Sequence, residues 1–356
     1  MKVGLVFGGR SAEHRVSVIS ARTVELALVA AGYEVVPIPL GEDGSWRARE
    51  EGRRALDGKV DSLPTGGGAT PGSLPDLLDI EVVFPIAHGT WGEDGSLQGL
   101  LEMLDIPYAG AGVATSAVAM DKHLCKSVLS AAGMPVVEWE VVSRASKRQD
   151  FETLLAEFEP PFFVKPAVGG SSVGVERVVE RSQLAAAVGR ALAFDDRVLV
   201  ERGVVGRELE CSVLGYTSLE ASRIGEIVPG REFYDYRDKY LDDTADLKVP
   251  AELDPDLESR LRQTAIDAFA AIGGHGMARV DFLVENGEDI LVNEINTLPG
   301  FTSISMYPKL WEVTGLPIEQ LVNRLVEIAV ERHADRQRLD VGIRSWLDLQ
   351  GREEKS

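Results

Sequence analysis

The chain has 356 residues and a formal net charge of -20. A chain of this length is expected to form two or three domains with a large buried core. So acidic a protein is not expected to bind nucleic acid. Nucleotides are not excluded, because a few local cations and a metal ion can hold them.

Other features of the sequence exclude further classes of protein. No apolar run approaches the ~18–20 residues of a membrane span, and the first residues lack the apolar segment and cleavage site of a signal peptide. Cys125 and Cys211 provide neither a disulfide framework nor zinc-site spacing. We expect both to be small core residues of a cytoplasmic protein that has no membrane partner.

The first third of the chain predicts a small open α/β unit. Strands are expected at 3–7, 33–40 and 81–87, with a helix over 17–31 that ends at Gly32. Residues 41–79, rich in Gly, Pro and charge, are expected to be a surface excursion without chemistry. The third strand runs into a glycine-rich turn that carries His88 and Glu93, a position that commonly faces a ligand. A lone His or Glu is more often structural.

The middle of the chain contains a candidate phosphate loop. A helix is expected from about Asp121 to Gly133, and strands at 138–142, 162–165, 198–201 and 209–214. The loop after Lys165 contains three glycines and two serines, and such a loop can present backbone N–H groups to phosphate. The alternative is a flexible hairpin loop. Glu201 ends a strand and could hold a purine edge or simply be exposed.

Residues 229–250 show no periodicity and have the length of a lid. After them, Asp254 and Pro255 are expected to begin a helix. Its core-facing stripe is Leu257, Leu261, Ala265, Ala268 and Phe269. A second helix is expected over about 317–333, followed by a charged peripheral tail.

The stretch 279–300 predicts a β-hairpin with a polar face. Asn286 and Gly287 are the strongest short turn signal. A two-residue turn would pair Glu285 with Glu288 and place Arg279 opposite Glu294. By alternation, Arg279, Asp281, Glu294 and Asn296 then share one face, while Val280, Phe282, Leu291 and Ile295 face a core.

This polar face suits a hard cation. Magnesium takes one or two carboxylates and completes its octahedron with water and phosphate oxygens, and Asp281 and Glu294 would be diagonal neighbours within reach of one ion. The alternative is a solvated face with an Arg279–Glu294 surface pair. Gly300, just after the second strand, favours a site, because glycine lets the backbone approach a ligand closely.

Six blocks of the sequence, in order, resemble the D-alanine–D-alanine ligases of the ATP-grasp superfamily. They are MKVGLVFGGRSAEHRVS, FPIAHGTWGEDGSLQGLLEMLDIPYAGAGVATSAVAMDK, FFVKPAVGGSSVGV, EFYDYRDKY, GMARVDF and NEINTLPGFTSISMYP. The resemblance implies an α/β protein, α+β in its nucleotide-binding half, with three domains of ATP-grasp architecture. We expect an N-terminal open α/β substrate domain (1–112), a central domain (113–202), a C-terminal domain with metal site and lid (203–340), and a peripheral tail (341–356).

The resemblance also implies roles for individual residues. The residues implied to bind ATP are Lys122, Lys165, Ser172, Glu201, Arg202, Val204, Glu208 and Lys239. Those implied to bind the amino-acid substrates are Glu13, His88, Lys239, Arg279 and Ser305. Catalytic roles fall on Glu13, Ser171 and Tyr240, which would hydrogen-bond to one another, and on Arg279 and the N–H of Gly300, which would form an oxyanion site. The metal ligands would be Asp281, Glu294 and Asn296.

The implied reaction joins two D-alanines at the cost of ATP through an acyl phosphate, and it supplies peptidoglycan synthesis. Two Mg²⁺ ions are expected, with Mn²⁺ as a substitute, and a homodimer is the family expectation. Three alternatives remain at this stage. They are a D-alanine–D-lactate ligase, another ATP-grasp carboxylate–amine ligase, and a non-catalytic nucleotide sensor that would have lost a metal ligand.

Overall fold

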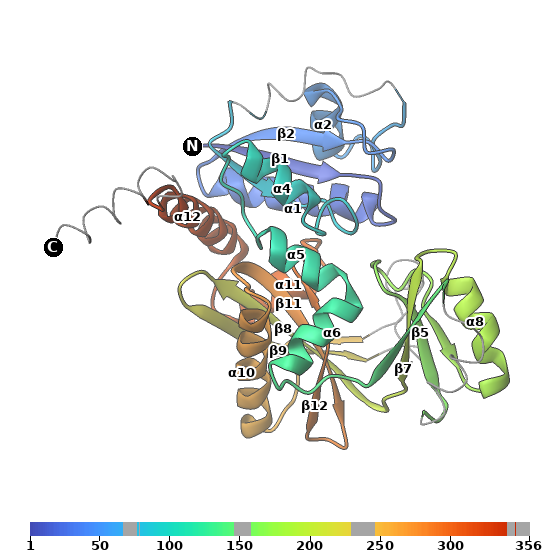
Figure 1. Cartoon of the computed structure of the whole chain (residues 1–356). Coiled ribbons are helices and arrows are strands. Elements are labelled where there is room, and N and C mark those ends of the chain that lie inside the picture. The colour runs from blue at the N-terminus through green and yellow to red at the C-terminus, as the bar shows by residue number, and fades with distance from the viewer. Residues whose placement is uncertain (67–76, 78, 146–157, 229–245, 340–345, 347–356) are drawn as a thin grey trace.

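The computed structural model describes residues 1–66, 77, 79–145, 158–228, 246–339 and 346. Three sheets organise these residues (Figure 1). No helix in the described ranges is long and apolar enough to cross a membrane.

The first sheet is parallel and three-stranded, in the order β2 (Glu34–Leu40), β1 (Lys2–Gly8), β3 (Val82–Pro85). This sheet shares its cores with α1 (His14–Ala30), α2 (Arg49–Leu56) and α4 (Ser96–Met103). The expected α/β unit is therefore confirmed. The expectation of a bare surface excursion over 41–79 is wrong, because α2 lies within it and Leu56 and Leu63 are buried in the same core as β1.

The second sheet is antiparallel and four-stranded. Its order is β4 (Trp139–Ser143), β7 (Arg197–Arg202), β5 (Phe162–Pro166), β6 (Glu176–Val178). A short 3₁₀ turn (Arg181–Gln183) leads into α8 (Leu184–Ala191), whose Leu184 and Val188 share a core with this sheet.

The third sheet is antiparallel and five-stranded. Its order is β10 (Asp246–Lys248), β9 (Leu219–Val228), β8 (Gly206–Gly215), β11 (Gly276–Glu285), β12 (Asp289–Asn296). The helix α10 (Pro255–Ala271) packs on it through the predicted stripe, and the Asp254 carboxylate caps that helix by accepting from the N–H of Asp256. After β12 come α11 (Met306–Thr314) and α12 (Ile318–Gln337).

Three helices connect the units that are built on the three sheets. The helix α12 is four residues longer at its C-terminal end than predicted, and its Leu321 and Leu325 share a core with α1 and β1. The helix predicted from about Asp121 to Gly133 is α6 (Lys122–Ala131), and a further helix that was not predicted, α5 (Val113–Met120), ends at Asp121 directly before it. Both pack into the core of the five-stranded sheet, and α6 lies between this sheet and the four-stranded one (Figure 1).

The hairpin of β11 and β12 has the predicted faces but not the predicted pairs. Glu285 pairs with Asp289, so the loop has three residues, and Arg279 stands opposite Asn296 instead of Glu294. An extra residue in the loop would turn every β12 side chain to the other face. A bulge at Asn293, where the register shifts, turns them back.

The three-residue loop also changes one core residue. Val280, Phe282 and Ile295 are buried as expected, but Leu291 is only half-buried, and Val292 takes the core position. Asp281 and Glu294 are direct cross-strand partners instead of diagonal neighbours. Their side chains therefore start closer together than the sequence predicted.

Candidate active site

A cavity of about 310 Å³ lies where the three sheets meet, and every described residue that the sequence proposed for the site lines it. These residues are Glu13, His88, Lys122, Lys165, Ser171, Ser172, Glu201, Arg202, Val204, Glu208, Arg279, Asp281, Glu294, Asn296, Gly300 and Ser305. Lys239 and Tyr240 lie outside the described residues, as does the rest of the predicted lid up to residue 245.

The glycine loop contacts the N-terminal unit through Ser171. The hydroxyl of Ser171 donates a hydrogen bond to the Glu13 carboxylate. A Cβ at Gly170 would lie 2.8 Å from Glu13 Oε2, so a larger residue there would displace the Glu13 carboxylate. Ser171 and Ser172 have φ of 49° and 57°, in the left-handed region that L-residues rarely occupy. The loop backbone is thus held in an uncommon shape at its contact with Glu13.

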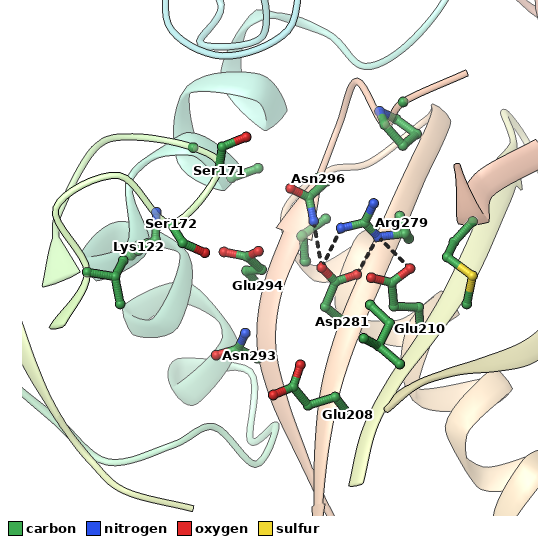
Figure 2. Close-up of a pocket in the computed structure, with 18 of the residues that line it drawn as sticks. Lys122, Ser171, Ser172, Glu208, Glu210, Arg279, Asp281, Asn293, Glu294 and Asn296 are labelled. Carbon is green, nitrogen blue, oxygen red and sulfur yellow. Dashed lines mark hydrogen bonds and ion pairs between the residues drawn. The ribbon is translucent and has the colours of Figure 1, made fainter. Parts of the chain in front are cut away.

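On the polar face of the hairpin, the Asp281 carboxylate is held from two sides (Figure 2). Arg279 donates to it through Nε and Nη2, both at 2.7 Å, and Asn296 donates through Nδ2 at 2.9 Å. Glu210 of β8, which the sequence analysis missed, lies 3.2 Å from Arg279 Nε. Burial opposes the charge on Arg279, but Asp281 and Glu210 outweigh it and raise the pKa of the guanidinium well above its usual value.

The same face fits a magnesium site. No group of three His, Cys, Asp or Glu side chains in the described parts of the chain is placed to hold a metal. Magnesium needs only one or two carboxylates when substrate phosphates supply other ligands. Asp281 and Glu294 face each other across the strands. Asn296 uses its amide nitrogen toward Asp281, which leaves its amide oxygen as the atom suited to a cation.

At the other end of the cavity, two lysines contact the Glu201 carboxylate. Lys165 Nζ lies 2.6 Å from Oε2, and Lys126 Nζ lies 3.2 Å from Oε1. Burial would raise the pKa of Glu201, but the two ammonium groups outweigh burial and lower it to about 2. Lys165 also faces the bulge residue, with its Nζ 3.4 Å from Asn293 Oδ1.

Arg202 and Lys122 also have partners of their own. The Arg202 guanidinium contacts Glu138 at 2.8 Å and Glu285 at 2.9 Å. Its side chain therefore has a carboxylate partner on each of two other segments. Lys122 Nζ donates to the carbonyl of Gly169 at 2.7 Å, which places the ammonium beside the glycine loop.

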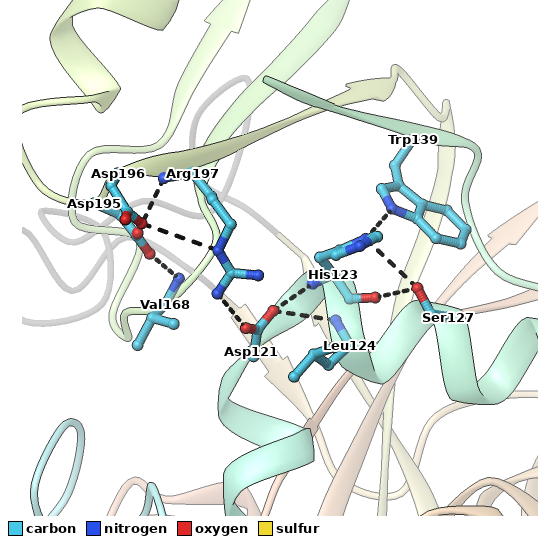
Figure 3. Close-up of polar contacts among 9 residues, drawn as sticks. All are labelled: Asp121, His123, Leu124, Ser127, Trp139, Val168, Asp195, Asp196 and Arg197. Carbon is cyan, nitrogen blue, oxygen red and sulfur yellow. Dashed lines mark hydrogen bonds and ion pairs between the residues drawn. The ribbon is translucent and has the colours of Figure 1, made fainter. Parts of the chain in front are cut away.

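The start of α6 is tied to β7, the neighbour of the strand that leads into the glycine loop (Figure 3). The Asp121 carboxylate caps the helix by accepting from the N–H groups of His123 and Leu124, both at 3.1 Å, and it also pairs with Arg197 of β7. Asp195 accepts from the N–H of Val168 at 2.7 Å. Lys122 therefore projects from a helix end whose position relative to the loop is fixed.

His88 and Glu93 are buried at the wall shared with the N-terminal unit. His88 Nδ1 lies 2.9 Å from the carbonyl oxygen of Leu298, and Nε2 lies 3.2 Å from Ser20 Oγ. Burial lowers the pKa of His88. Burial, aided by the nearby Glu13 carboxylate, raises the pKa of Glu93 to about 8. Glu93 is thus neutral at pH 7, and His88 bridges two units of the fold.

Comparison with known proteins places the whole arrangement in one family. Residues 2–111 match the family model described as D-ala D-ala ligase N-terminus, and residues 128–327 match the one described as D-ala D-ala ligase C-terminus. This chain belongs to the D-alanine–D-alanine ligase family.

Individual relatives agree with the family match. The chain is 43% identical over 338 residues to a D-alanine--D-alanine ligase of Halothermothrix orenii, covering 93% of this chain and 98% of that protein. It superposes on the D-alanine-D-alanine ligase of Coxiella burnetii with a TM-score of 0.81 and 38% identity, covering 97% of this chain and 99% of the other. The VanG D-Ala:D-Ser ligase of Enterococcus faecalis gives a TM-score of 0.79 at 31% identity over 92% of this chain and 99% of that chain.

Three residues in or beside the cavity of this D-alanine–D-alanine ligase were not predicted from the sequence. Asn293 reaches the cavity only because of the bulge, and Glu210 only because β8 pairs with β11. Lys126 does not line the cavity, but it contacts a residue that does. A lysine four residues after Lys122 lies on nearly the same helical face, and this spacing was the available signal.

Proposed function

We propose that this protein joins two molecules of D-alanine into D-alanyl-D-alanine, converting ATP to ADP and phosphate, in the cytoplasm and for peptidoglycan synthesis. The observation that carries the proposal is the meeting, in one cavity, of the glycine loop, the Glu13–Ser171 contact and the polar face of the hairpin. The glycine loop, Glu13 and the hairpin belong to units that are built on three different sheets. The identity of the substrates is inferred from the family.

A carboxylate is a poor acyl donor, because its leaving group would be oxide. Transfer of the γ-phosphoryl group of ATP to the first D-alanine gives an acyl phosphate, whose leaving group is phosphate. Such a transfer depends on positioning and on neutralising charge more than on covalent chemistry. We assign Lys122 and Lys165, together with the N–H groups of the glycine loop, to the phosphates, and Glu201, Arg202, Val204 and Glu208 to the adenosine.

Acidic side chains outnumber basic ones among the described residues that line the cavity, although ATP is itself an anion. Apart from Glu93, which is neutral at pH 7, the acidic ones are Glu13, Glu201, Glu208, Glu210, Asp281 and Glu294, and the basic ones are Lys122, Lys165, Arg202 and Arg279. We therefore assign Asp281, Glu294 and Asn296 to Mg²⁺. When bound, the metal would neutralise the phosphate charge that develops during transfer.

The second step is attack on the acyl phosphate by the amine of the second D-alanine. Negative charge then develops on the oxygen of the tetrahedral carbon, and we assign its stabilisation to Arg279 and the N–H of Gly300. The bidentate contact with Asp281 fixes the orientation of the Arg279 guanidinium before substrate arrives. Glu13 is assigned to the ammonium of the first D-alanine, and Ser305 and Lys239 to the second substrate and the phosphate.

The test is an assay of purified protein with ATP, Mg²⁺ and D-alanine as the sole amino acid. We expect ADP, phosphate and the D,D-dipeptide in equal amounts, and little turnover with L-alanine, because Glu13 and Arg279 hold the two ends of the first substrate around one chiral centre. Equal rates with both enantiomers, or ATP hydrolysis without dipeptide, would contradict the proposal. Parallel reactions that add D-serine or D-lactate distinguish the related ligase activities.

A further inference from the structure

The helix α6 carries a second lysine, Lys126, which contacts an active-site residue but does not itself line the cavity. Lys126 is 2% exposed and does not line the cavity. Its ammonium lies 3.2 Å from Glu201 Oε1 and 3.2 Å from the carbonyl oxygen of Val137. The ring of Trp139 adds a cation–π contact at 5.8 Å. A lysine so deeply buried is unusual unless it is paired.

The partner of Lys126 is a residue of the nucleotide site. Glu201 is buried on β7, and its other oxygen lies 2.6 Å from Lys165. One carboxylate is thus bracketed by two ammonium groups, one that lines the cavity and one that does not. A carboxylate with an anchor on each oxygen has a fixed plane, and it can still accept a further hydrogen bond because each oxygen has two lone pairs.

The charge of Lys126 matters for Lys165 as well. With both lysines present, this cluster has one carboxylate and two ammonium groups, so a net positive charge remains for an anionic ligand. Without Lys126, the Glu201 carboxylate would be balanced by Lys165 alone. The field that Lys165 presents to a phosphate would weaken, and one side of Glu201 would lose its anchor.

We propose that Lys126 is a positioning residue for ATP, which acts through Glu201 to fix the carboxylate at the adenosine end and to keep Lys165 available to the phosphates. The inference rests on the proposed nucleotide site. It extends that site to a residue that does not touch the ligand.

The same helix supports this role. Asp121 caps α6 and pairs with Arg197 of β7, the strand that carries Glu201 (Figure 3). The helix therefore contacts β7 at two points. Asp121 pairs with Arg197 at the start of the strand, and Lys126 pairs with Glu201 near its end. Lys126 is the contact that reaches a cavity residue.

The test is calorimetric titration of ATP, with Mg²⁺ and without D-alanine, into Lys126→Met and into the wild type. Methionine is close to lysine in length but carries no charge. We expect ATP to bind at least about tenfold more weakly to Lys126→Met. In the Glu201→Gln background the same substitution should change ATP affinity less than about twofold, because the residue through which Lys126 acts has lost its charge. In steady state, the KM for ATP should rise by a larger factor than the KM for D-alanine.

The control is Leu129→Ala, which removes a buried side chain from the same helix. It should lower the melting temperature and leave ATP affinity unchanged. If Lys126→Met does not fold, Lys126→Gln serves in the same titrations. An unchanged affinity for ATP, or an equal loss in the wild-type and Glu201→Gln backgrounds, would overturn the proposal. Because the titration needs no dipeptide synthesis, its result is separate from the success or failure of the ligase assay.

Discussion

The two ends of the active-site cavity differ in how their charges are balanced. At the end that we propose to hold adenosine, the Glu201 carboxylate has a lysine on each oxygen, and burial makes each contact strong. At the hairpin end, a single guanidinium, Arg279, contacts both Asp281 and Glu210, and Glu294 faces Asp281 across the strands. The first end is arranged before any ligand arrives. Among the described residues, the second end has more carboxylates than cationic groups, an arrangement suited to bound cations.

The two ends are therefore expected to contribute to ligand binding in different ways. A preformed end costs little reorganisation when the nucleotide binds, whereas an acidic end makes binding of the triphosphate conditional on a metal. The ammonium group of an amino acid would add positive charge on the Glu13 side. The acidic end is therefore expected to be the place where substitutions affect turnover most.

The largest effect is expected when charge is removed from the acidic end. Asp281→Asn and Glu294→Gln should each lower kcat by at least ~10²-fold, because each removes a charge that faces the transferring phosphoryl group. The measurement is ADP release at saturating Mg²⁺, with circular dichroism to confirm the fold. Near wild-type rates in both folded variants would contradict the difference between the two ends.

A smaller effect is expected at the contact between the glycine loop and Glu13. Ser171→Ala removes the hydroxyl that donates to the Glu13 carboxylate. The loss should lower kcat/KM for D-alanine about tenfold, the equivalent of ~1.4 kcal/mol in the transition state. Affinity for ATP alone should change less. If Ser171→Ala loses affinity for ATP but keeps its kcat/KM for D-alanine, the hydroxyl serves ATP binding and this prediction is wrong.

The smallest effect is on stability and concerns Glu93. Burial and the Glu13 carboxylate raise the pKa of Glu93 to about 8 from its ordinary value of 4.5. The folded protein therefore keeps this proton between about pH 4.5 and 8 while the unfolded chain loses it, so the contribution of Glu93 to stability falls as pH rises through that window.

Glu93→Gln removes this dependence. Between pH 5.5 and 8, the unfolding free energy of the wild type should fall more than that of the variant, because only the wild type keeps this proton in the folded state. Denaturant unfolding of the ligand-free protein at the two pH values measures it. Parallel pH profiles for the two proteins would show that Glu93 titrates normally.

Periodicity and turn signals predicted much of the fold. The apolar stripe of α10, its Asp254 cap and the polar face of the hairpin follow from local rules, and all three are present. The helix α2 was missed because its eight residues carry mostly charged side chains around Gly52. The pairing of Arg279 was missed because the loop has three residues and a bulge adds one more residue to β12. Together they keep the polar side chains on the predicted face but move the partner of Arg279 from Glu294 to Asn296.

The active site was predictable where the chain itself supplies the pattern. The glycine loop and the hairpin carboxylates are contiguous motifs, and their residues do line the cavity. Glu210 and Lys126 come from β8 and α6, and they join the site through strand pairing and helix packing between distant segments. Strand pairing leaves no local signal of Glu210, and the four-residue spacing from Lys122 is a weak local signal of Lys126. Sequence alone therefore missed one such residue at each end.

The contrast between the two ends is tested most directly by titrating nucleotides with and without Mg²⁺. We expect ATP to bind at least about tenfold more weakly when EDTA removes the metal, because the triphosphate then meets Asp281 and Glu294 without a bridging cation. Adenosine, which carries no phosphate, should compete equally well in both conditions, because the Lys126–Glu201–Lys165 end is complete in the ligand-free protein. ATP affinity that is indifferent to Mg²⁺, or adenosine binding that requires it, would contradict the account.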